Sequence, residues 1–355
     1  MSDVVLSANT PLLQADIVLE GGGVRGIGHV GALSVLEEKG YHWVNIAGTS
    51  AGACVAAMMA ANYSALEMND IMRNEVNFNL FAQDSGLNGF FLMEAIHMLR
   101  RGGFHTGNYI ETFIRDKLMK AKPKPISTFK DLIIPGREHE PKDSIYRYRL
   151  TVIASDISQG LMLRLPQDML KFNQDPEELD VALAVHMSAS IPFFFMPLMQ
   201  KRQDRQNDLV VDGGLLSNFP VGIFDVANEP QHPTFGLRLV DSLPTPEHPW
   251  PTNPTNNVFQ IGQALLSTLL SAHDRLYMDD HTFVRTIAIP VEGISGTRFD
   301  LKPEEATKLY QNGSKAAEDF LSTWNFEAYK AAYRGNLQQK GRRERLHEEM
   351  KSKAC

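Results

Sequence analysis

The chain has 355 residues, of which 43% are hydrophobic and 22% are charged, so it carries enough apolar side chain to form a sizeable core. This composition excludes a disordered or fibrous protein. The chain has 35 Lys and Arg residues against 42 Asp and Glu residues, a net charge of −7, and this acidic balance disfavours nucleic acid as a partner.

Three further features bear on the cellular compartment. Cys54 and Cys355 lie too far apart to indicate a disulfide framework, which suits a reducing compartment. The longest stretch without a polar side chain, residues 51–61, is shorter than the roughly 18 residues that span a bilayer. The first ten residues have neither the basic start nor the apolar block of a secretory signal. We therefore expect a cytoplasmic protein.

The predicted elements begin with two strand–turn–helix units. Residues 17–19 form a short apolar strand that enters a glycine cluster, and apolar residues then recur at helical spacing up to Gly40. A second strand, residues 43–47, leads through a second glycine turn into a helix of small residues over 53–61. Because the unit repeats, we predict parallel strands joined by right-handed crossovers, with both glycine turns at one edge of the sheet.

Residues 62–142 have a more mixed pattern. Helical patches occur near residues 94–100 and 109–119, and a Lys-Pro-Lys-Pro loop follows. We interpret this segment as a helical insertion or cap. Strand patterning resumes over residues 146–156, where apolar and polar residues alternate.

The remaining elements complete an α/β pattern. Further strands are predicted at residues 209–211, 235–240 and 286–291, and the chain is predicted to be helical after Pro303. The pattern predicts an α/β fold with a mostly parallel central sheet flanked by helices, a helical insertion and a helical C-terminal tail. We divide the chain into an N-terminal extension (1–14), one domain (15–300) and a helical C-terminal segment (301–355).

The first candidate motif is the glycine cluster. Gly21, Gly23 and Gly26 match the dinucleotide pattern G-x-G-x-x-G between a strand and a helix. That pattern also needs an acidic residue near the end of the second strand, where the chain has Ala47-Gly48-Thr49-Ser50. The nucleotide interpretation fails there. Backbone N–H groups at a helix N-terminus suit any anion, including an oxyanion formed during acyl transfer.

The second motif, Gly48-Thr49-Ser50-Ala51-Gly52, has the G-x-S-x-G pattern between a strand and a helix. Gly48 and Gly52 let the chain turn so sharply that the Ser50 hydroxyl is exposed at the head of the helix, in a strained backbone conformation. A serine N-cap between helix-packing glycines is the alternative. The strand-to-helix context and the preceding glycine loop favour a nucleophile.

The third motif is a strand that delivers Asp212 into the turn Gly213-Gly214. Because these glycines lack side chains, another element can approach the carboxylate closely. This pattern more often marks an ordinary Asp-Gly turn, and the motif alone does not decide between such a turn and a functional carboxylate.

A serine hydrolase normally places a histidine between serine and acid. The downstream candidates are His232, His248, His273, His281 and His347. None of them has the strand-to-loop context of a catalytic base, and His29 and His186 have no neighbouring acid in the sequence. No Cys/His cluster has the spacing of metal ligands, so neither a metal site nor a cofactor is predicted.

Taken together, the three motifs resemble those of the patatin-like phospholipases, acyl hydrolases whose fold is similar to that of cytosolic phospholipase A2. The likeness lies in the order of the motifs, the short gap between the first two, and the stretches 154–160, 188–193 and 218–221. It spans roughly residues 15–240. It implies a three-layer α/β fold.

The resemblance also implies roles for individual residues. Ser50 would be the nucleophile and Asp212 the base that takes its proton directly, which removes the need for a histidine. The N–H groups of Gly22 and Gly23 would stabilise the oxyanion. Arg25 matches the family's arginine, and we expect it to brace the glycine loop rather than to attract a lipid phosphate.

A fatty-acyl ester of a glycerophospholipid is the substrate that the resemblance implies, ahead of lysophospholipids and simpler acyl esters. The protein would bind peripherally at a membrane surface, without insertion. Residues 191–199 either line an acyl groove or form a buried core segment. Three alternatives stay open, namely a broad-specificity carboxylesterase with a true triad, a signal-regulated effector that keeps the fold, and, as the weakest, a nucleotide-binding protein.

Overall fold

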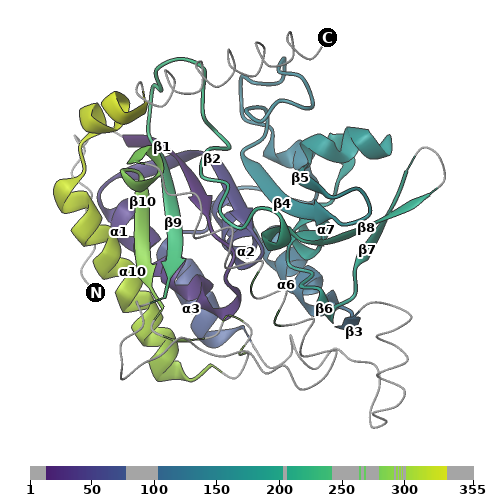
Figure 1. Cartoon of the computed structure of the whole chain (residues 1–355), viewed down its shortest axis with the longest axis horizontal. Helices are drawn as coiled ribbons and strands as arrows, with labels where there is room; N and C mark the ends of the chain where they lie inside the picture. Colours follow the sequence, from purple (N-terminus) through teal and green to yellow (C-terminus); the bar gives the residue numbers. More distant parts are fainter. Residues whose placement is uncertain are drawn as a thin grey trace, which may run out of the picture.

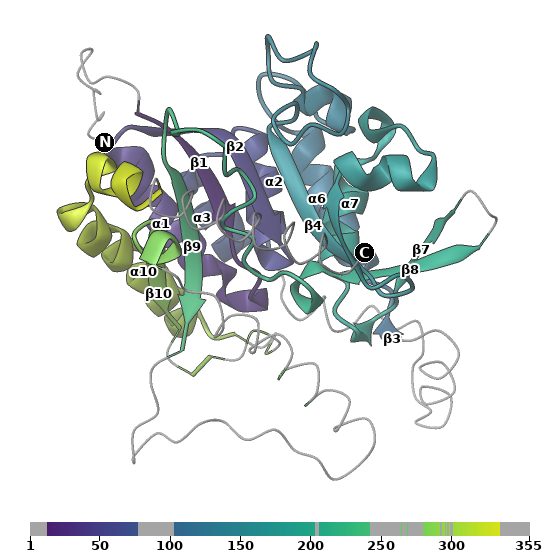
Figure 2. The same cartoon turned by 45° about the horizontal axis from the view of Figure 1, so that its top comes forward.

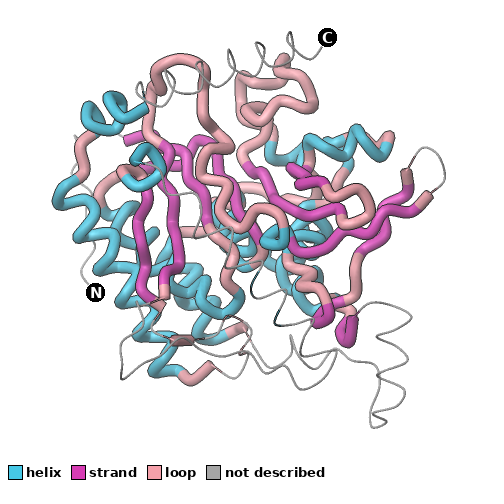
Figure 3. Tube along the Cα trace, in the orientation of Figure 1, coloured by secondary structure: helices cyan, strands magenta, loops and turns pink. Residues whose placement is uncertain are grey.

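The computed structural model describes residues 13–76, 103–202, 206–241, 280–291 and 301–333. It also describes six single residues, Ala264, Thr268, Gly293, Ile294, Gly296 and Arg298. Within these residues a central sheet is flanked by helices, as Figure 1 shows, and the sheet runs through the whole body in Figure 3. The predicted α/β fold with a mostly parallel sheet is confirmed.

Eight strands form the central sheet. Five are parallel, in the order β10 (Thr286–Pro290), β9 (Thr234–Val240), β1 (Leu13–Leu19), β2 (Tyr41–Thr49) and β4 (Leu150–Asp156). Three are antiparallel to their neighbours, namely β5 (Leu161–Leu165), β8 (Asn207–Asp212) and β7 (Leu198–Lys201). A small second sheet pairs β3 (Gly103–His105) with β6 (Phe193–Phe195). Figure 2 shows β7 and β8 projecting from the body as a hairpin.

The helices lie along the sheet in two groups. Figure 1 shows α1 (Ile27–Glu38), α3 (Ala65–Asn74) and α10 (Pro303–Thr323) on one side of α2 (Ala51–Ala60). On its other side lie α6 (Asn108–Met119) and α7 (Val181–Ser188). A short helix, α9 (Asp280–Phe283), precedes β10.

The core explains why these segments pair. All seven residues of β4 are buried, as expected of a strand that is covered on both faces. On one face of the sheet, Ile17 and Leu19 belong to the main core together with residues of α1 and α2. On the other face, Val18 and Ala47 pack against Phe224.

The predicted strand at residues 146–156 was wrong at its start, because the strand begins at Leu150. The alternation that suggested an earlier start belongs to a turn. Arg147 donates hydrogen bonds to the carbonyl groups of Glu138 and Glu140, so its side chain closes a loop instead of facing solvent from a strand. Strands β3, β5, β6 and β7 were missed.

Two predicted helical regions can be compared with the structure. The patch at 109–119 is α6, whereas the patch at 94–100 lies outside the described residues. After Pro303 the helix ends at Thr323, and a second helical stretch covers residues 326–333. The predicted tail beyond residue 333 lies outside the described residues.

The described parts of 62–142 contribute to the main core. Ile110, Ile114 and Leu118 of α6 are buried there, and α6 packs against α2 and α7. The division of the chain into an extension, a domain and a C-terminal segment stays a prediction. Within the described residues, no helix has both the length and the apolar character needed to cross a membrane.

Candidate active site

The register of the sheet brings two strand ends together on one edge of β4. Thr49, at the end of β2, lies opposite Ile153, and Asp212, at the end of β8, lies opposite the next residue, Ala154. The other edge of this part of β4 is occupied by β5. Because β2 is parallel and β8 antiparallel to β4, their C-terminal ends point at each other. Ser50 and Asp212 therefore meet.

Ser50 occupies a sharp turn between β2 and α2. Its φ of +52° is unusual for a residue with a side chain and indicates stored backbone strain. A Cβ on Gly48 would lie 2.4 Å from the carbonyl oxygen of Gly52, and a Cβ on Gly52 would lie 2.4 Å from that of Leu19. Only glycine fits at these two positions, so both predicted supporting glycines permit the turn.

Asp212 lies at the end of β8 with 4% of its surface exposed. Its Oδ1 accepts a hydrogen bond from the Gly214 N–H at 2.8 Å, while Oδ2 is buried without a hydrogen-bond partner among the described residues. A Cβ on Gly213 would lie 2.2 Å from the Ile153 carbonyl oxygen, which explains the glycine at that position.

Burial sets the ionisation of Asp212. It raises the pKa of this carboxyl to about 6, and the Ser50 hydroxyl and the Gly214 N–H oppose the shift. Contacts between a nucleophile and its base often tighten when substrate binds. A carboxylate with a raised pKa and a free oxygen is a better proton acceptor than an ordinary one.

The glycine loop lies beside Ser50. A Cβ on Gly21 would approach Ser50 Cβ to 3.2 Å. The N–H groups of Gly22 and Gly23 have no hydrogen-bond partner among the described residues, and they precede α1 through a turn of 3₁₀ helix at Gly23–Gly26. Gly23 has a φ of +57°, and a Cβ there would lie 1.9 Å from the carbonyl oxygen of Gly296. The loop thus presents unpaired N–H donors close to the serine.

Two residues fix the shape of this loop. Arg25 donates from Nε to the carbonyl oxygen of Gly22 at 3.2 Å, and its guanidinium lies 3.7 Å from Asp241. These contacts are of the kind that bracing requires. The main-chain carbonyl oxygen of Asn218 accepts a hydrogen bond from the Gly21 N–H, and the Asn218 side chain donates from Nδ2 to the Gly21 carbonyl oxygen, each at 3.2 Å. Sequence reasoning assigned no role to Asn218.

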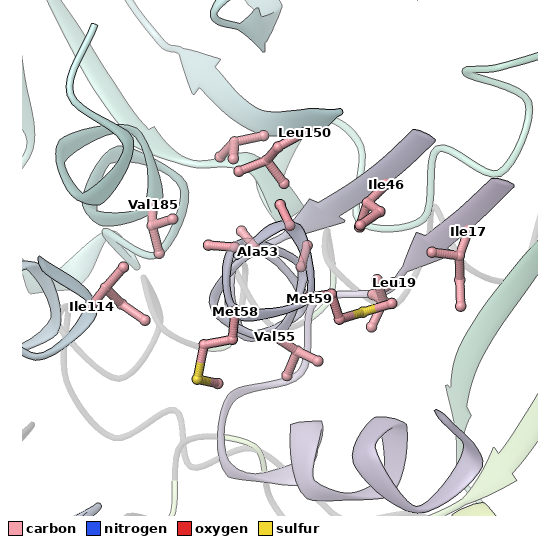
Figure 4. Close-up of a cluster of buried hydrophobic side chains, with 14 of the residues drawn as sticks. Ile17, Leu19, Ile46, Ala53, Val55, Met58, Met59, Ile114, Leu150 and Val185 are labelled. Carbon is pink, nitrogen blue, oxygen red and sulfur yellow. The ribbon is translucent and has the colours of Figure 1, made fainter. Parts of the chain in front are cut away.

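An apolar pocket opens beside Ser50, with about 790 Å³ of empty volume including its mouth. Ala51, Cys54, Val55 and Met58 line it from successive turns of α2. Figure 4 looks along this helix, with Met59 directed toward Leu19 of the sheet and with Met58 and Val55 directed away from it. Other lining residues include Ile110, Phe113 and Ile114 of α6, and also Ile191 and Phe195.

The run 191–199 and Cys54 both contribute to this pocket. Of the run 191–199, Ile191 and Phe195 line the pocket while Phe193 and Met199 are exposed, so neither a continuous groove wall nor a buried segment describes the run. Burial raises the pKa of the Cys54 thiol to about 12, so this neighbour of Ser50 stays protonated and is a poor nucleophile.

Three of the histidines considered as a base, His29, His186 and His232, have described side chains that contact groups other than Ser50 Oγ. His29 bonds to the Glu20 carbonyl oxygen, and burial lowers its pKa to about 4. His186 contacts Glu111 and the Thr106 carbonyl oxygen. His232 Nε2 lies 3.1 Å from Asp16 Oδ1, in the middle of β1.

The other candidates cannot be placed in this way. His248, His273 and His347 lie outside the described residues, as does the side chain of His281. Within the described part of the chain, no group of three His, Cys, Asp or Glu residues is arranged to hold a metal ion.

Comparisons with known proteins identify the family to which the sequence is similar. The sequence matches the family model of the patatin-like phospholipases over residues 17–225. It is 34% identical over 311 residues to the uncharacterized protein YqhO of Bacillus subtilis (strain 168), covering 88% of this chain and 99% of that protein. It is 26% identical over 313 residues to the uncharacterized protein R571 of Acanthamoeba polyphaga mimivirus, covering 85% of this chain and 92% of that protein.

A solved structure has a similar fold. The crystal structure of VipD from Legionella pneumophila superposes with a TM-score of 0.51 at 16% sequence identity, over 89% of this chain and 68% of that chain.

Proposed function

The chain belongs to the patatin-like phospholipase family, and we propose that it hydrolyses carboxylic esters of lipids with Ser50 as nucleophile and Asp212 as general base. The resemblance predicted from the three motifs is thereby confirmed for the family, while the residue roles are our proposal. One observation carries it: the register of β2 and β8 on β4 brings Ser50 and the buried Asp212 together beside an apolar pocket.

The chemistry follows from these positions. As Ser50 Oγ attacks the ester carbonyl carbon, its proton passes to Asp212 Oδ2 and the carbonyl oxygen becomes an oxyanion. The N–H groups of Gly22 and Gly23 stabilise that charge. Asp212 then gives its proton to the departing alcohol oxygen as the ester bond breaks, which leaves an acyl group on Ser50.

Water completes the cycle by the same route in reverse. It attacks the acyl carbon, Asp212 accepts its proton, and the fatty acid leaves as Ser50 Oγ regains a proton. No histidine is required, because the buried carboxylate has a pKa closer to that of the reacting groups than an exposed one.

The pocket supports a fatty-acyl substrate. Its lining is apolar and begins at Ser50, so an acyl chain whose carbonyl carbon reaches Ser50 would bury its methylenes against α2 and α6. A phospholipid at a membrane surface is the substrate class that this site and the family favour. An esterase with a Ser-His-Asp triad is less well supported, because His29, His186 and His232 make other contacts.

Hydrolysis measured against pH tests the proposed function. We expect the wild type to hydrolyse p-nitrophenyl butyrate and mixed phospholipid vesicles, with kcat/KM rising about tenfold per pH unit below the Asp212 pKa of about 6 and levelling above it. The value of kcat/KM rises with pH because only the carboxylate form of Asp212 accepts a proton. Activity that is flat from about pH 5 to pH 7, or no hydrolysis of either substrate, would contradict the proposal.

Substitutions at Met58 test the acyl pocket. Met58 lines the pocket about two helical turns from Ser50, or about 12 Å along α2. A Trp there would fill the pocket and an Ala would enlarge it. Because each buried methylene contributes about 0.8 kcal/mol, losing room for two should lower kcat/KM for long chains roughly tenfold.

The readout is kcat/KM for p-nitrophenyl esters with acyl chains of about 4 to 16 carbons. Met58→Trp should move the preference to shorter chains, and Met58→Ala should retain or lengthen it. The two variants control for each other, because general destabilisation would move both in the same direction. Unchanged chain-length profiles in both would show that acyl chains bind elsewhere.

A further inference from the structure

The end of α7 makes contacts that the proposed reaction does not use. Ser188 is fully buried, and its hydroxyl accepts a hydrogen bond from the Ser50 N–H at 2.8 Å. The same hydroxyl donates to the carbonyl oxygen of Ile153. Two residues later, the Ser190 carbonyl oxygen accepts the Asp212 N–H at 2.9 Å. One short segment therefore binds the backbone of both reacting residues.

The backbone of Ser50 makes the first contact important. A φ of +52° is costly for a residue with a side chain, and such a conformation persists only where its surroundings hold it. The Ser50 N–H donates to the side chain of Ser188 rather than to the main chain, so this hydroxyl anchors the turn together with the Thr49 hydroxyl, which donates to the Ser217 carbonyl oxygen. Loss of that hydroxyl would leave the Ser50 N–H buried and unpaired.

The second contact of Ser188, to the Ile153 carbonyl oxygen, ties this hydroxyl to the part of β4 where β2 and β8 end. Ile153 lies opposite Thr49, and the next residue of β4 lies opposite Asp212. The Ser188 hydroxyl thus connects the nucleophile's backbone to the position on β4 where the two strand ends meet.

We propose that Ser188 is a positioning residue that holds the Ser50 N–H, so that the Ser50 hydroxyl faces Asp212 and the mouth of the apolar pocket. This inference rests on the proposed function, and it adds a residue that acts through Ser50 without touching the substrate. The hydroxyl of Ser188 holds the backbone of the Ser50 turn in place. This raises the rate of the reaction, because attack depends on the position of Ser50 Oγ.

The variant Ser188→Ala tests this role. With p-nitrophenyl butyrate as substrate, we expect kcat to fall about 10- to 100-fold with KM within about twofold of the wild type, because misplacement of a reacting group costs rate rather than binding. The rate at which a fluorophosphonate labels Ser50 should fall by a similar factor. Labelling reports the nucleophile directly, without deacylation or product release.

The pH profile gives a readout that a general loss of stability would not move. The Ser50 hydroxyl lowers the Asp212 pKa in the wild type. When Ser50 is displaced, the midpoint of the pH–rate profile should rise above the wild-type value. A variant with merely fewer folded molecules would keep the wild-type midpoint.

Two variants serve as controls, and the activity of each is measured below its own unfolding temperature. Thr151→Val removes an equally buried hydroxyl of β4 that accepts a hydrogen bond from Gln167 Nε2 at 3.3 Å, and it should keep kcat within about twofold. Ser188→Thr keeps a hydroxyl at the position and should restore most of the rate that Ser188→Ala loses.

The outcomes are separable. Wild-type kcat, labelling rate and midpoint in Ser188→Ala would overturn the inference, and so would an equal loss of kcat in Thr151→Val. A wild type that hydrolyses no ester and is not labelled at Ser50 would instead overturn the proposed function on which the inference rests.

Discussion

Replacing Ser50 with alanine is expected to lower kcat for lipid esters by at least about 10⁴-fold, because the reaction then has no nucleophile. The change removes only the hydroxyl. The N–H that donates to Ser188 remains, and so do the flanking glycines that permit the turn. We therefore expect the variant to fold with a free energy of unfolding close to that of the wild type.

The measurement is hydrolysis of phospholipid vesicles and p-nitrophenyl butyrate, combined with thermal unfolding and fluorophosphonate labelling. Ser34→Ala is a matched control, since it removes a hydroxyl on α1 that bonds to the Gly31 carbonyl oxygen. It should retain wild-type turnover and labelling. A folded Ser50→Ala protein with more than about 1% of wild-type activity would show that another residue attacks the ester.

The site residues that sequence reasoning found are those with strong local signals. Ser50 stands in a five-residue pattern between a strand and a helix, and Gly21–Gly26 lies in the same context one unit earlier. Each pattern constrains its own backbone, so glycines could be identified without knowledge of the rest of the chain. Asp212 had only an Asp-Gly turn to mark it and depended on the family resemblance.

The contacts that complete the site come from long-range pairing. The meeting of Ser50 with Asp212 depends on β8 running antiparallel on the edge of β4 that β2 also uses. Nothing within β8 specifies that register. Ser188 lies 138 residues from Ser50 and Asn218 lies 197 residues from Gly21, so their hydrogen bonds leave no local pattern in the sequence.

Strand prediction failed where side chains served another purpose. Arg147 alternates with tyrosines as an exposed strand residue would, yet its guanidinium is buried in hydrogen bonds to backbone carbonyl groups and to Glu177. Alternation alone cannot separate these cases. The short strands β6 and β7 were hidden in a run rich in phenylalanine and methionine, which periodicity cannot divide.

The burial that suits Asp212 to its proposed role as base also costs stability. Its folded pKa of about 6 lies above the ordinary value of 3.8, so between these two pH values the folded protein keeps a proton that the unfolded chain has released. The free energy of unfolding therefore falls as pH rises through this window. At neutral pH the loss is complete and amounts to about 3 kcal/mol as an upper bound.

The single substitution Asp212→Asn should accordingly lower the activity and raise the free energy of unfolding. The amide has almost the same shape, and its oxygen can still accept the Gly214 N–H, but it cannot take the Ser50 proton. We expect kcat to fall about 10³- to 10⁴-fold and the midpoint of thermal unfolding at pH 7.5 to rise by several degrees, because the buried charge is gone.

The control for this variant is pH itself. Near pH 4 the wild-type carboxyl is protonated in the folded protein, so the stability gain of Asp212→Asn should shrink there while it persists at pH 7.5. Asp156→Asn provides the comparison at a second buried carboxylate, one that accepts hydrogen bonds from the Ser158 and Gln159 N–H groups. If a folded Asp212→Asn protein kept wild-type activity, Asp212 would not be the base.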